Sequence, residues 1–167
     1  MSIKGKVWKY GDDVNTDVIF PGKYTYTITD PKEMATHALE DLDPKFAKEV
    51  EKEDIIVAGR NFGCGSSREQ AATCLKYAGV GVIVAKSFAR IFFRNAINQG
   101  LPLVQCKEAV ENIFSGETIT IDFEKGELSC KKGIFNFPPL PESVLGILKD
   151  GGLIPHVKKI LKIEKGE

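Results

Sequence analysis

The chain has 167 residues and carries 23 Lys and Arg against 23 Asp and Glu, so its formal net charge is zero. A neutral chain has no overall basic field to hold nucleic acid or an anionic membrane, and we expect neither as a partner. Apolar residues make up 43% and charged residues 28%, a mix that excludes a disordered or fibrous chain. The apolar stretch from Ala78 to Ala85 is too short to span a bilayer, and the N-terminus has no apolar core of a signal peptide. We therefore expect a cytoplasmic protein with one domain over residues 1–167.

The cysteines are spread along the chain, and they form no C-x-x-C pair. Zinc and iron–sulfur sites need ligands at close, regular spacings, and the chain has only two histidines to add to its thiols. We therefore expect no metal and no cofactor bound by this chain itself, and reduced thiols. The four cysteines are Cys64, Cys74, Cys106 and Cys130.

The first two thirds of the chain alternate between strand and helix patterns. Buried strands are predicted by short apolar runs, and helices by a cap residue ahead of an apolar stripe. In chain order we expect a strand at 3–9, a long loop at 10–29, a helix capped by Asp30, a short helix after Asp43-Pro44, a strand at 54–58, a helix at 67–77 stopped by Gly79, a strand at 80–85, a helix at 87–98 capped by Ser87 and a strand at 101–106. This alternation predicts right-handed crossovers and a parallel sheet that is covered on both faces.

The last third of the chain has a different pattern. After a short helix near 108–114, apolar and polar residues alternate over 117–123, 127–131 and 133–137, which predicts antiparallel strands. A helix is expected from Pro141 to Lys149, and the lysines after it are interpreted as a solvated face. The fold class is therefore α/β, with a parallel central sheet joined to a smaller antiparallel β portion.

A glycine-rich loop, 59–69, connects the strand at 54–58 to the next helix. In a parallel sheet this is the carboxyl end of a strand, where ligands bind. Glycines such as Gly63 and Gly65 let the backbone turn sharply and approach a ligand closely. The free N–H groups of the following helix favour an anion there.

The side chains that close this loop also favour an anion. Ser66 and Ser67 offer hydroxyl groups, and Arg68 offers a planar fork that suits a carboxylate or phosphate. A dinucleotide fingerprint needs glycine at the position of Arg68, and the spacing of a P-loop is absent. The plainer alternative is a capped helix with a tight turn and a surface arginine. The convergence of glycines, serines and an arginine favours the anion site over that alternative.

A second basic segment follows the strand at 80–85. Lys86 and Arg90 flank a predicted helix start there, on the same edge of the sheet as the glycine loop. This placement can bring both cations to one cleft with Arg68. Taken alone, Lys86 and Arg90 would be interpreted as solvated.

Four motifs in order resemble the small subunit of 3-isopropylmalate dehydratase (isopropylmalate isomerase), the stand-alone form of the aconitase swivel domain. They are GRNFGCGSSREQA at 59–71, KSFARIFFRNAINQGL at 86–101, the early Asn15-Thr16-Asp17 with Pro21, and GGLIPHVKKIL at 151–161. The resemblance covers nearly the whole chain and implies a three-layer β/β/α swivel domain. The chain departs from it at Gln70, where the family usually has histidine, so no role is carried over to that position.

The resemblance also implies an activity and a partner. Members of this family remove water from a 2-hydroxy di-acid and add it back one carbon over. A [4Fe-4S] cluster is expected in the large subunit and none in this chain, which would be active only with that partner. By the same resemblance Ser66 is the base that takes the proton from carbon, while Ser67 and Arg68 bind substrate carboxylate. Gly63 and Gly65 are expected to support the anion.

Substrate choice is expected to lie in the early loop, at Lys23-Tyr24-Thr25-Tyr26-Thr27. In the family this loop meets the substituent that distinguishes the substrates, and homoaconitase-like relatives place an arginine there. The loop of this chain has no arginine, which favours an apolar isopropyl group, although the ammonium of Lys23 could reach an anion. Tyr24 and Tyr26 could also be no more than one face of a strand.

Two other functions remain open from the sequence. One is a homoaconitase-type small subunit, with the same chemistry on a longer substrate. The other is a non-catalytic module that binds an anion alone and needs no iron–sulfur partner.

Overall fold

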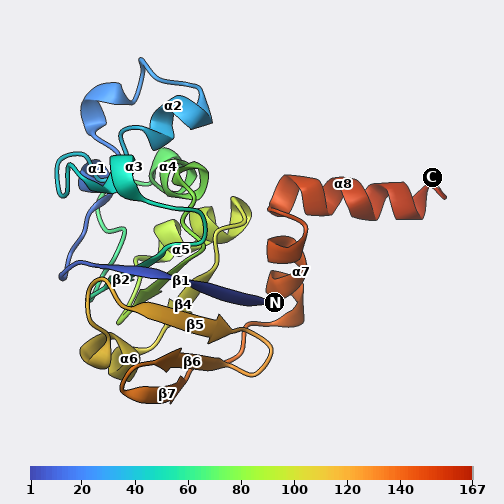
Figure 1. The fold of residues 1–167 in the computed structure, drawn as a ribbon. Coiled ribbons are helices and arrows are strands. Elements are labelled where there is room, and N and C mark those ends of the chain that lie inside the picture. The colour runs from blue at the N-terminus through green and yellow to red at the C-terminus, as the bar shows by residue number, and fades with distance from the viewer. Residues whose placement is uncertain (167) are drawn as a thin grey trace.

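The computed structural model describes residues 1–166 (Figure 1). Its strands are β1 (Ser2–Lys9), β2 (Ile55–Ala58), β3 (Val82–Ala85), β4 (Leu103–Gln105), β5 (Thr118–Asp122), β6 (Glu127–Cys130) and β7 (Gly133–Asn136). Its helices are α1 (Thr16–Ile19), the 3-10 turn η1 (Gly22–Tyr24), α2 (Pro31–Ala35), α3 (Phe46–Glu49), α4 (Gln70–Ala78), α5 (Arg90–Asn98), α6 (Lys107–Asn112), α7 (Glu142–Lys149) and α8 (Leu153–Glu164).

The strands form one mixed sheet in the order β4-β3-β2-β1-β5-β6-β7. Strands β1 to β4 pair in parallel, and β5 to β7 pair antiparallel. Strand β1 belongs to both halves, because residues 7–9 pair with β2 and residues 2–6 pair with β5. The predicted combination of a parallel centre and an antiparallel portion is confirmed.

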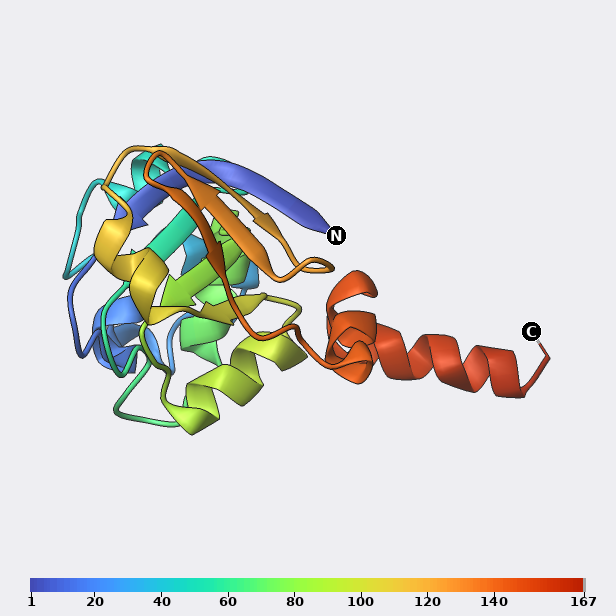
Figure 2. The same cartoon turned by 90° about the horizontal axis from the view of Figure 1, so that it is seen from below.

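The parallel strands are buried on both faces, and alternate residues enter two different cores. Ile56 and Ala58 of β2 pack with α2, α4 and α5, whereas Ile55 and Val57 pack with apolar residues of β5 and β6. The antiparallel half therefore folds over one face of the parallel half, and helices cover the other face (Figures 1 and 2). The three-layer β/β/α arrangement expected from the resemblance is confirmed.

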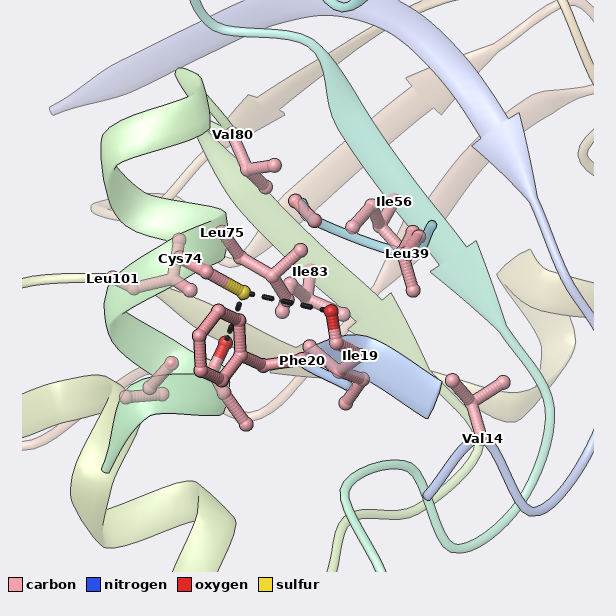
Figure 3. Packing of buried hydrophobic residues seen from close by; sticks show 14 of the residues in the cluster. Val14, Ile19, Phe20, Leu39, Ile56, Cys74, Leu75, Val80, Ile83 and Leu101 are labelled. Atoms are coloured by element: carbon pink, nitrogen blue, oxygen red, sulfur yellow. Dashed lines mark hydrogen bonds between the residues drawn. The ribbon is translucent and has the colours of Figure 1, made fainter. Parts of the chain in front are cut away.

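The core under α4 fixes the position of α1, which lies in the segment 10–29. The sequence predicts a loop throughout this segment, and α1 is a short helix within it. Ile19 and Phe20 are fully buried, and Figure 3 shows them against α4 and the neighbouring strands. The thiol of Cys74 donates to the carbonyl oxygens of Ala71, at 3.2 Å, and Ile19, at 3.6 Å. These contacts hold the carboxyl end of α1 and leave its first residues facing the glycine loop.

Two helices begin later than the sequence predicts. Helix α4 begins at Gln70 rather than Ser67, and α5 begins at Arg90 rather than Ser87. Ser87 does not cap α5, because its hydroxyl oxygen accepts a hydrogen bond from the backbone N–H of Asn61. Both predicted starts were wrong for a similar reason: Ser87 bonds to Asn61, and Arg68 bonds to Asp17 and Thr25, so each segment is held by other parts of the chain ahead of its helix.

The helix ends follow their predicted signals more closely. The Asp30 carboxylate accepts a hydrogen bond from the N–H of Glu33, as a cap should, and Gly79 ends α4 with a φ of +105°. The lysine-rich tail forms α8, which extends away from the sheet with no buried residue (Figure 2). Within residues 1–166, no helix has the length and apolar character needed to cross a membrane.

A buried carboxylate joins β1 to the start of β2. Asp54 is 4% exposed and accepts hydrogen bonds from the indole N–H of Trp8 at 2.9 Å and the N–H of Glu51 at 3.0 Å. It also accepts one from the N–H of Lys6, at 3.3 Å. A buried carboxylate is tolerated only when its oxygens are paired in this way.

We expect Asp54→Ala to lower the free energy of unfolding by about 3 kcal/mol, because three donors lose a charged acceptor. Urea denaturation monitored by circular dichroism measures this change. Asp41→Ala, at an exposed position, is the control and should change stability by less than about 0.5 kcal/mol. Equal effects of the two variants would contradict the role of Asp54.

Candidate active site

The glycine loop, 59–69, is held by backbone hydrogen bonds on both sides. The N–H of Gly63 donates to the carbonyl of Val14 and the N–H of Thr16 donates to that of Cys64, each at 2.8 Å. On the other side the N–H of Phe62 donates to the carbonyl of Ser87 at 3.1 Å. The loop therefore extends β2 between two neighbouring segments and places residues 65–68 at a defined position.

Glycine is required at position 63. Gly63 has a φ of +82°, and a Cβ atom there would lie 2.1 Å from Cγ of Phe92. Gly65 has a φ of +100°, with the hydroxyl oxygen of Thr16 3.3 Å from the place of a Cβ atom. The two glycines let the loop pass close to α5 and α1, and they bring Ser66 to the first residue of α1.

Ser66 is exposed and makes three hydrogen bonds with two side chains, those of Thr16 and Arg68. Nε of Arg68 donates to its hydroxyl oxygen at 3.0 Å, and the hydroxyl oxygen of Thr16 lies 3.0 Å from the same atom. The backbone N–H of Ser66 also donates to the Thr16 hydroxyl oxygen at 3.0 Å. Helix α4 begins four residues later, so hydrogen bonds rather than the helix end polarise the Ser66 oxygen.

The guanidinium of Arg68 is largely inside the protein, with 16% of its side chain exposed. Nη2 pairs with the carboxylate of Asp17 and donates to the carbonyl of Phe20 at 3.3 Å. Nη1 donates to the hydroxyl oxygen of Thr25 at 2.6 Å. Arginine has five N–H donors, and these contacts with the one to Ser66 use four of them. A substrate carboxylate that binds the fork with two oxygens must displace at least one of these partners.

The loop from Lys23 to Thr27 meets Arg68 through one residue. Besides its contact with Nη1, Thr25 accepts a hydrogen bond at its carbonyl from the amide of Gln70, at 2.9 Å. Gln70, the departure from the family pattern, therefore holds this loop against α4. Tyr26 is 96% exposed, and Thr27 is exposed beside it.

Tyr24 points away from Ser66 and anchors the loop to the segment after α2. Its hydroxyl donates to Glu40 at 3.1 Å, and its ring stacks on His37 with 4.1 Å between ring centroids. Hydrogen bonds from His37 and Tyr24 lower the pKa of the Glu40 carboxyl. Lys23 lies 3.8 Å from Glu40, so its charge also faces this cluster.

An open cavity of about 510 Å³ adjoins Ser66. It is lined by Gly63, Gly65, Ser66, Ala89, Arg90, Ile91 and Arg94. Arg90 and Arg94 lie one turn apart on α5, and both are exposed. Arg90 was predicted at this site, but Arg94 was missed, although its spacing of four residues from Arg90 on a predicted helix signals a shared face. The cavity thus offers two guanidinium groups beside a hydroxyl group.

Two predicted residues lie outside the hydrogen-bond network of Ser66 and Arg68. Lys86 pairs with Glu111 at 3.3 Å and lines a separate cavity of about 300 Å³. Ser67 is exposed, and its carbonyl accepts a hydrogen bond from the side-chain amide of Asn95 at 3.2 Å. The structure therefore gathers Ser66, Arg68 and Thr25 in one network and leaves Lys86 outside it.

The cysteines do not gather at this site. Cys64 lies in the glycine loop, where burial and the nearby Asp13 raise the pKa of its thiol. Across residues 1–166, no three His, Cys, Asp or Glu side chains come together in an arrangement that would hold a metal ion. The donor set of these described residues therefore does not fit an iron–sulfur cluster.

Residues 12–109 match the family model for the aconitase C-terminal domain, which covers the whole glycine loop and both arginines of α5. A 3-isopropylmalate dehydratase small subunit from Caldicellulosiruptor saccharolyticus is 53% identical over 97% of this chain and 94% of its own length. The chain belongs to this family of dehydratase small subunits. The resemblance predicted from the four motifs is thereby confirmed.

Other members of the family match over similar lengths. A small subunit 1 from Archaeoglobus fulgidus is 50% identical over 93% of this chain and 97% of its own. The crystal structure of 3-isopropylmalate dehydratase (leuD) from Methanocaldococcus jannaschii superposes with a TM-score of 0.93, at 44% identity and 99% coverage of both chains. Aconitase X from Thermococcus kodakaraensis has the fold alone, with a TM-score of 0.51 at 16% identity over 81% of this chain and 92% of its own.

We expect Gly63→Ala to destabilise the fold by about 3 kcal/mol or more, because a clash with Phe92 adds to the strain of a positive φ. Gly116→Ala is a matched control: Gly116 has a φ of +85°, but a Cβ atom there would meet no atom within 4 Å. The control should lose only about 1 kcal/mol. Urea denaturation of both variants measures the difference, and equal losses would show that the approach to Phe92 carries no cost.

Proposed function

We propose that this chain is the catalytic small subunit of a 3-isopropylmalate dehydratase, which interconverts 2-isopropylmalate and 3-isopropylmalate by dehydration and rehydration in leucine biosynthesis. The observation that carries the proposal is the polarised Ser66 beside a cavity with two exposed arginines. Close relatives over nearly the full chain, named as small subunits of this dehydratase, support the same function.

Ser66 acts as the base in this proposal. Its oxygen, as the alkoxide, takes the proton from the substrate carbon, so that a C–H bond breaks and an O–H bond forms. The freed electron pair forms the C=C bond while the hydroxyl group leaves the neighbouring carbon with its own pair. Return of the proton and of water with the two carbons exchanged completes the isomerisation.

The arginines hold the di-acid substrate. Arg90 and Arg94 face the cavity that contains the Ser66 hydroxyl, so they can meet its carboxylates directly. Arg68 has one Nη1 hydrogen left for substrate, and Ser67 offers its exposed hydroxyl. Each hydrogen bond to a charged group contributes about 1.5–3 kcal/mol, and exclusion of water strengthens it.

The large subunit completes the site. As the family resemblance implies, that subunit would hold a [4Fe-4S] cluster, which would supply a Lewis acid for the leaving hydroxyl. The ligand set of this chain does not fit a cluster, so this chain contributes the base and the anion-binding groups. The exposure of Ser66 and of the cavity beside it leaves them open to a partner that closes over them.

The loop from Lys23 to Thr27 determines substrate choice in this proposal. Thr25 is already bonded to Arg68, and Tyr24 faces Glu40, so the exposed Tyr26 and Thr27 are the side chains free to meet a substituent. The ammonium of Lys23 lies near the Glu40 carboxylate and over the ring of Tyr24, so its positive charge is paired within the protein. An isopropyl group therefore fits this loop better than a further carboxylate, which would need its own cation.

We expect Ser66→Ala to abolish turnover by the complex reconstituted with the large subunit, because no other group on the chain replaces the base. Ser115→Ala, at an exposed serine remote from the loop, should retain wild-type kcat. Steady-state kinetics with 2-isopropylmalate, together with gel filtration to verify assembly, measures both. The chain alone should show no turnover. Near-normal kcat for Ser66→Ala would exclude Ser66 as the base.

We expect Tyr26→Arg and Thr27→Arg to shift preference from isopropylmalate toward homoaconitate, because each supplies a guanidinium for the additional carboxylate. Thr25→Arg should shift it as well, but it also removes the contact with Arg68 and so lowers kcat for both substrates. The ratio of kcat/KM for the two substrates measures the shift, and Thr29→Arg is the control outside the loop. An unchanged ratio in every loop variant would place specificity elsewhere, and a wild-type preference for homoaconitate would identify Lys23 as the ligand.

A further inference from the structure

Thr16 is a buried polar residue whose side chain faces the proposed base. It is 1% exposed, as the first residue of α1. The other two buried polar residues, Asp54 and Glu117, accept hydrogen bonds from backbone N–H groups away from Ser66. Of these three residues, Thr16 is therefore the one whose side chain contacts Ser66.

The position of the Thr16 hydroxyl hydrogen follows from its neighbours. A threonine hydroxyl has one hydrogen to donate and can accept others. The backbone N–H of Ser66 donates to the Thr16 hydroxyl oxygen at 3.0 Å, so this oxygen already accepts one hydrogen bond. Among the contacts of residues 1–166, the acceptor within hydrogen-bond distance of the Thr16 hydroxyl is Ser66 Oγ, at 3.0 Å. If Ser66 donated to Thr16 instead, the Thr16 hydrogen would be buried without a partner, which is unfavourable.

We propose that Thr16 is a positioning residue that donates its hydroxyl hydrogen to Ser66 and stabilises the Ser66 alkoxide. Arg68 Nε donates to the same oxygen, so the two donors occupy both lone pairs of the neutral hydroxyl. The hydrogen of Ser66 then points away from both donors. Because Ser66 lines the open cavity, its proton can leave and be replaced from that side.

The position of Thr16 is set by the packing of α1. The Asn15 side chain caps the helix by accepting a hydrogen bond from the N–H of Val18 at 2.9 Å. The backbone of Thr16 donates to Cys64 at 2.8 Å, and Ile19 is fully buried one turn on. The donor is thus in place before substrate binds, as preorganised stabilisation of an anion requires.

The charged groups around Ser66 come from three segments. Arg68 lies in the same loop, Asp17 follows Thr16 on α1, and Arg90 and Arg94 line the cavity from α5. None of these side chains is changed by a substitution of Thr16. A Thr16 variant without the hydroxyl loses both the donor to Ser66 Oγ and the acceptor of the Ser66 backbone N–H. A shift in its pH profile reports the loss of the donor, whereas the loss of the acceptor displaces the backbone of the loop and lowers kcat without such a shift.

The test compares Thr16→Val, which keeps the shape of the side chain, with Thr16→Ser, which keeps the hydroxyl. It rests on the proposed function, so Ser66→Ala is run beside them in the reconstituted complex. We expect Thr16→Val to lower kcat on the order of 100-fold with little change in KM, and to move the rise of kcat/KM to higher pH. Thr16→Ser should restore most of the activity and the wild-type profile.

The outcomes separate the inference from the function on which it rests. Wild-type kcat for Thr16→Val, or equal losses in Thr16→Val and Thr16→Ser, would overturn the role of Thr16. Activity in Ser66→Ala would instead overturn Ser66 as the base. If Thr16→Val does not assemble with the large subunit, Thr16→Ala takes its place, because it also lacks the hydroxyl and adds no methyl group to the core.

Discussion

The guanidinium of Arg68 joins three segments of the site that are otherwise separate. It pairs with Asp17 of α1, bonds to Thr25 of the early loop and donates to Ser66 of the glycine loop. The planar fork fixes the angles between these contacts, which a flexible ammonium group would not do. The geometry of the site thus depends on a side chain that is itself mostly buried. The guanidinium of Arg68 is already hydrogen-bonded to protein groups, so it is not free to bind a ligand through two nitrogens. Its main role is to hold Asp17, Thr25 and Ser66 in position.

The loop from Lys23 to Thr27 contains both anchored and solvent-exposed residues. Tyr24 is tied to Glu40 and stacked on His37, and the carbonyl of Thr25 is held by Gln70. These contacts fix two consecutive residues in the middle of the loop and leave Tyr26 and Thr27, which follow them, exposed to solvent. Substitutions at such exposed positions can be made without breaking the hydrogen bonds of Tyr24 and Thr25.

The parallel and antiparallel halves of the sheet could be predicted from the sequence because their signals are local. Continuous apolar runs mark β2 and β3 as strands buried on both faces, and a glycine marks the end of α4. The start of α4 could not be predicted in the same way. Arg68 sits at a sequence position that suits a helix, but its bonds to Asp17 and Thr25 hold it outside one.

The site was predicted in part, for a related reason. Ser66 and Arg68 stand out within one short motif, and Arg90 follows the next strand. Thr16 lies fifty residues before Ser66 in the chain, and no local pattern connects the two. Tyr24 was predicted to contact substrate together with the rest of its loop, and its hydroxyl donates to Glu40 instead of facing Ser66's network. Contacts between distant segments decide such cases, and a single sequence does not contain them.

The double pairing of β1 has a consequence for how the chain assembles. Residues 7–9 pair with residues 55–57, whereas residues 2–6 pair with residues 118–122, which are synthesised much later. During synthesis the first strand is therefore half paired while most of the chain is still to emerge, and its free edge is open to wrong partners. Long sequence separation of this kind slows folding. The short apolar strands of the parallel half can close earlier, and the last layer is added only when β5 arrives.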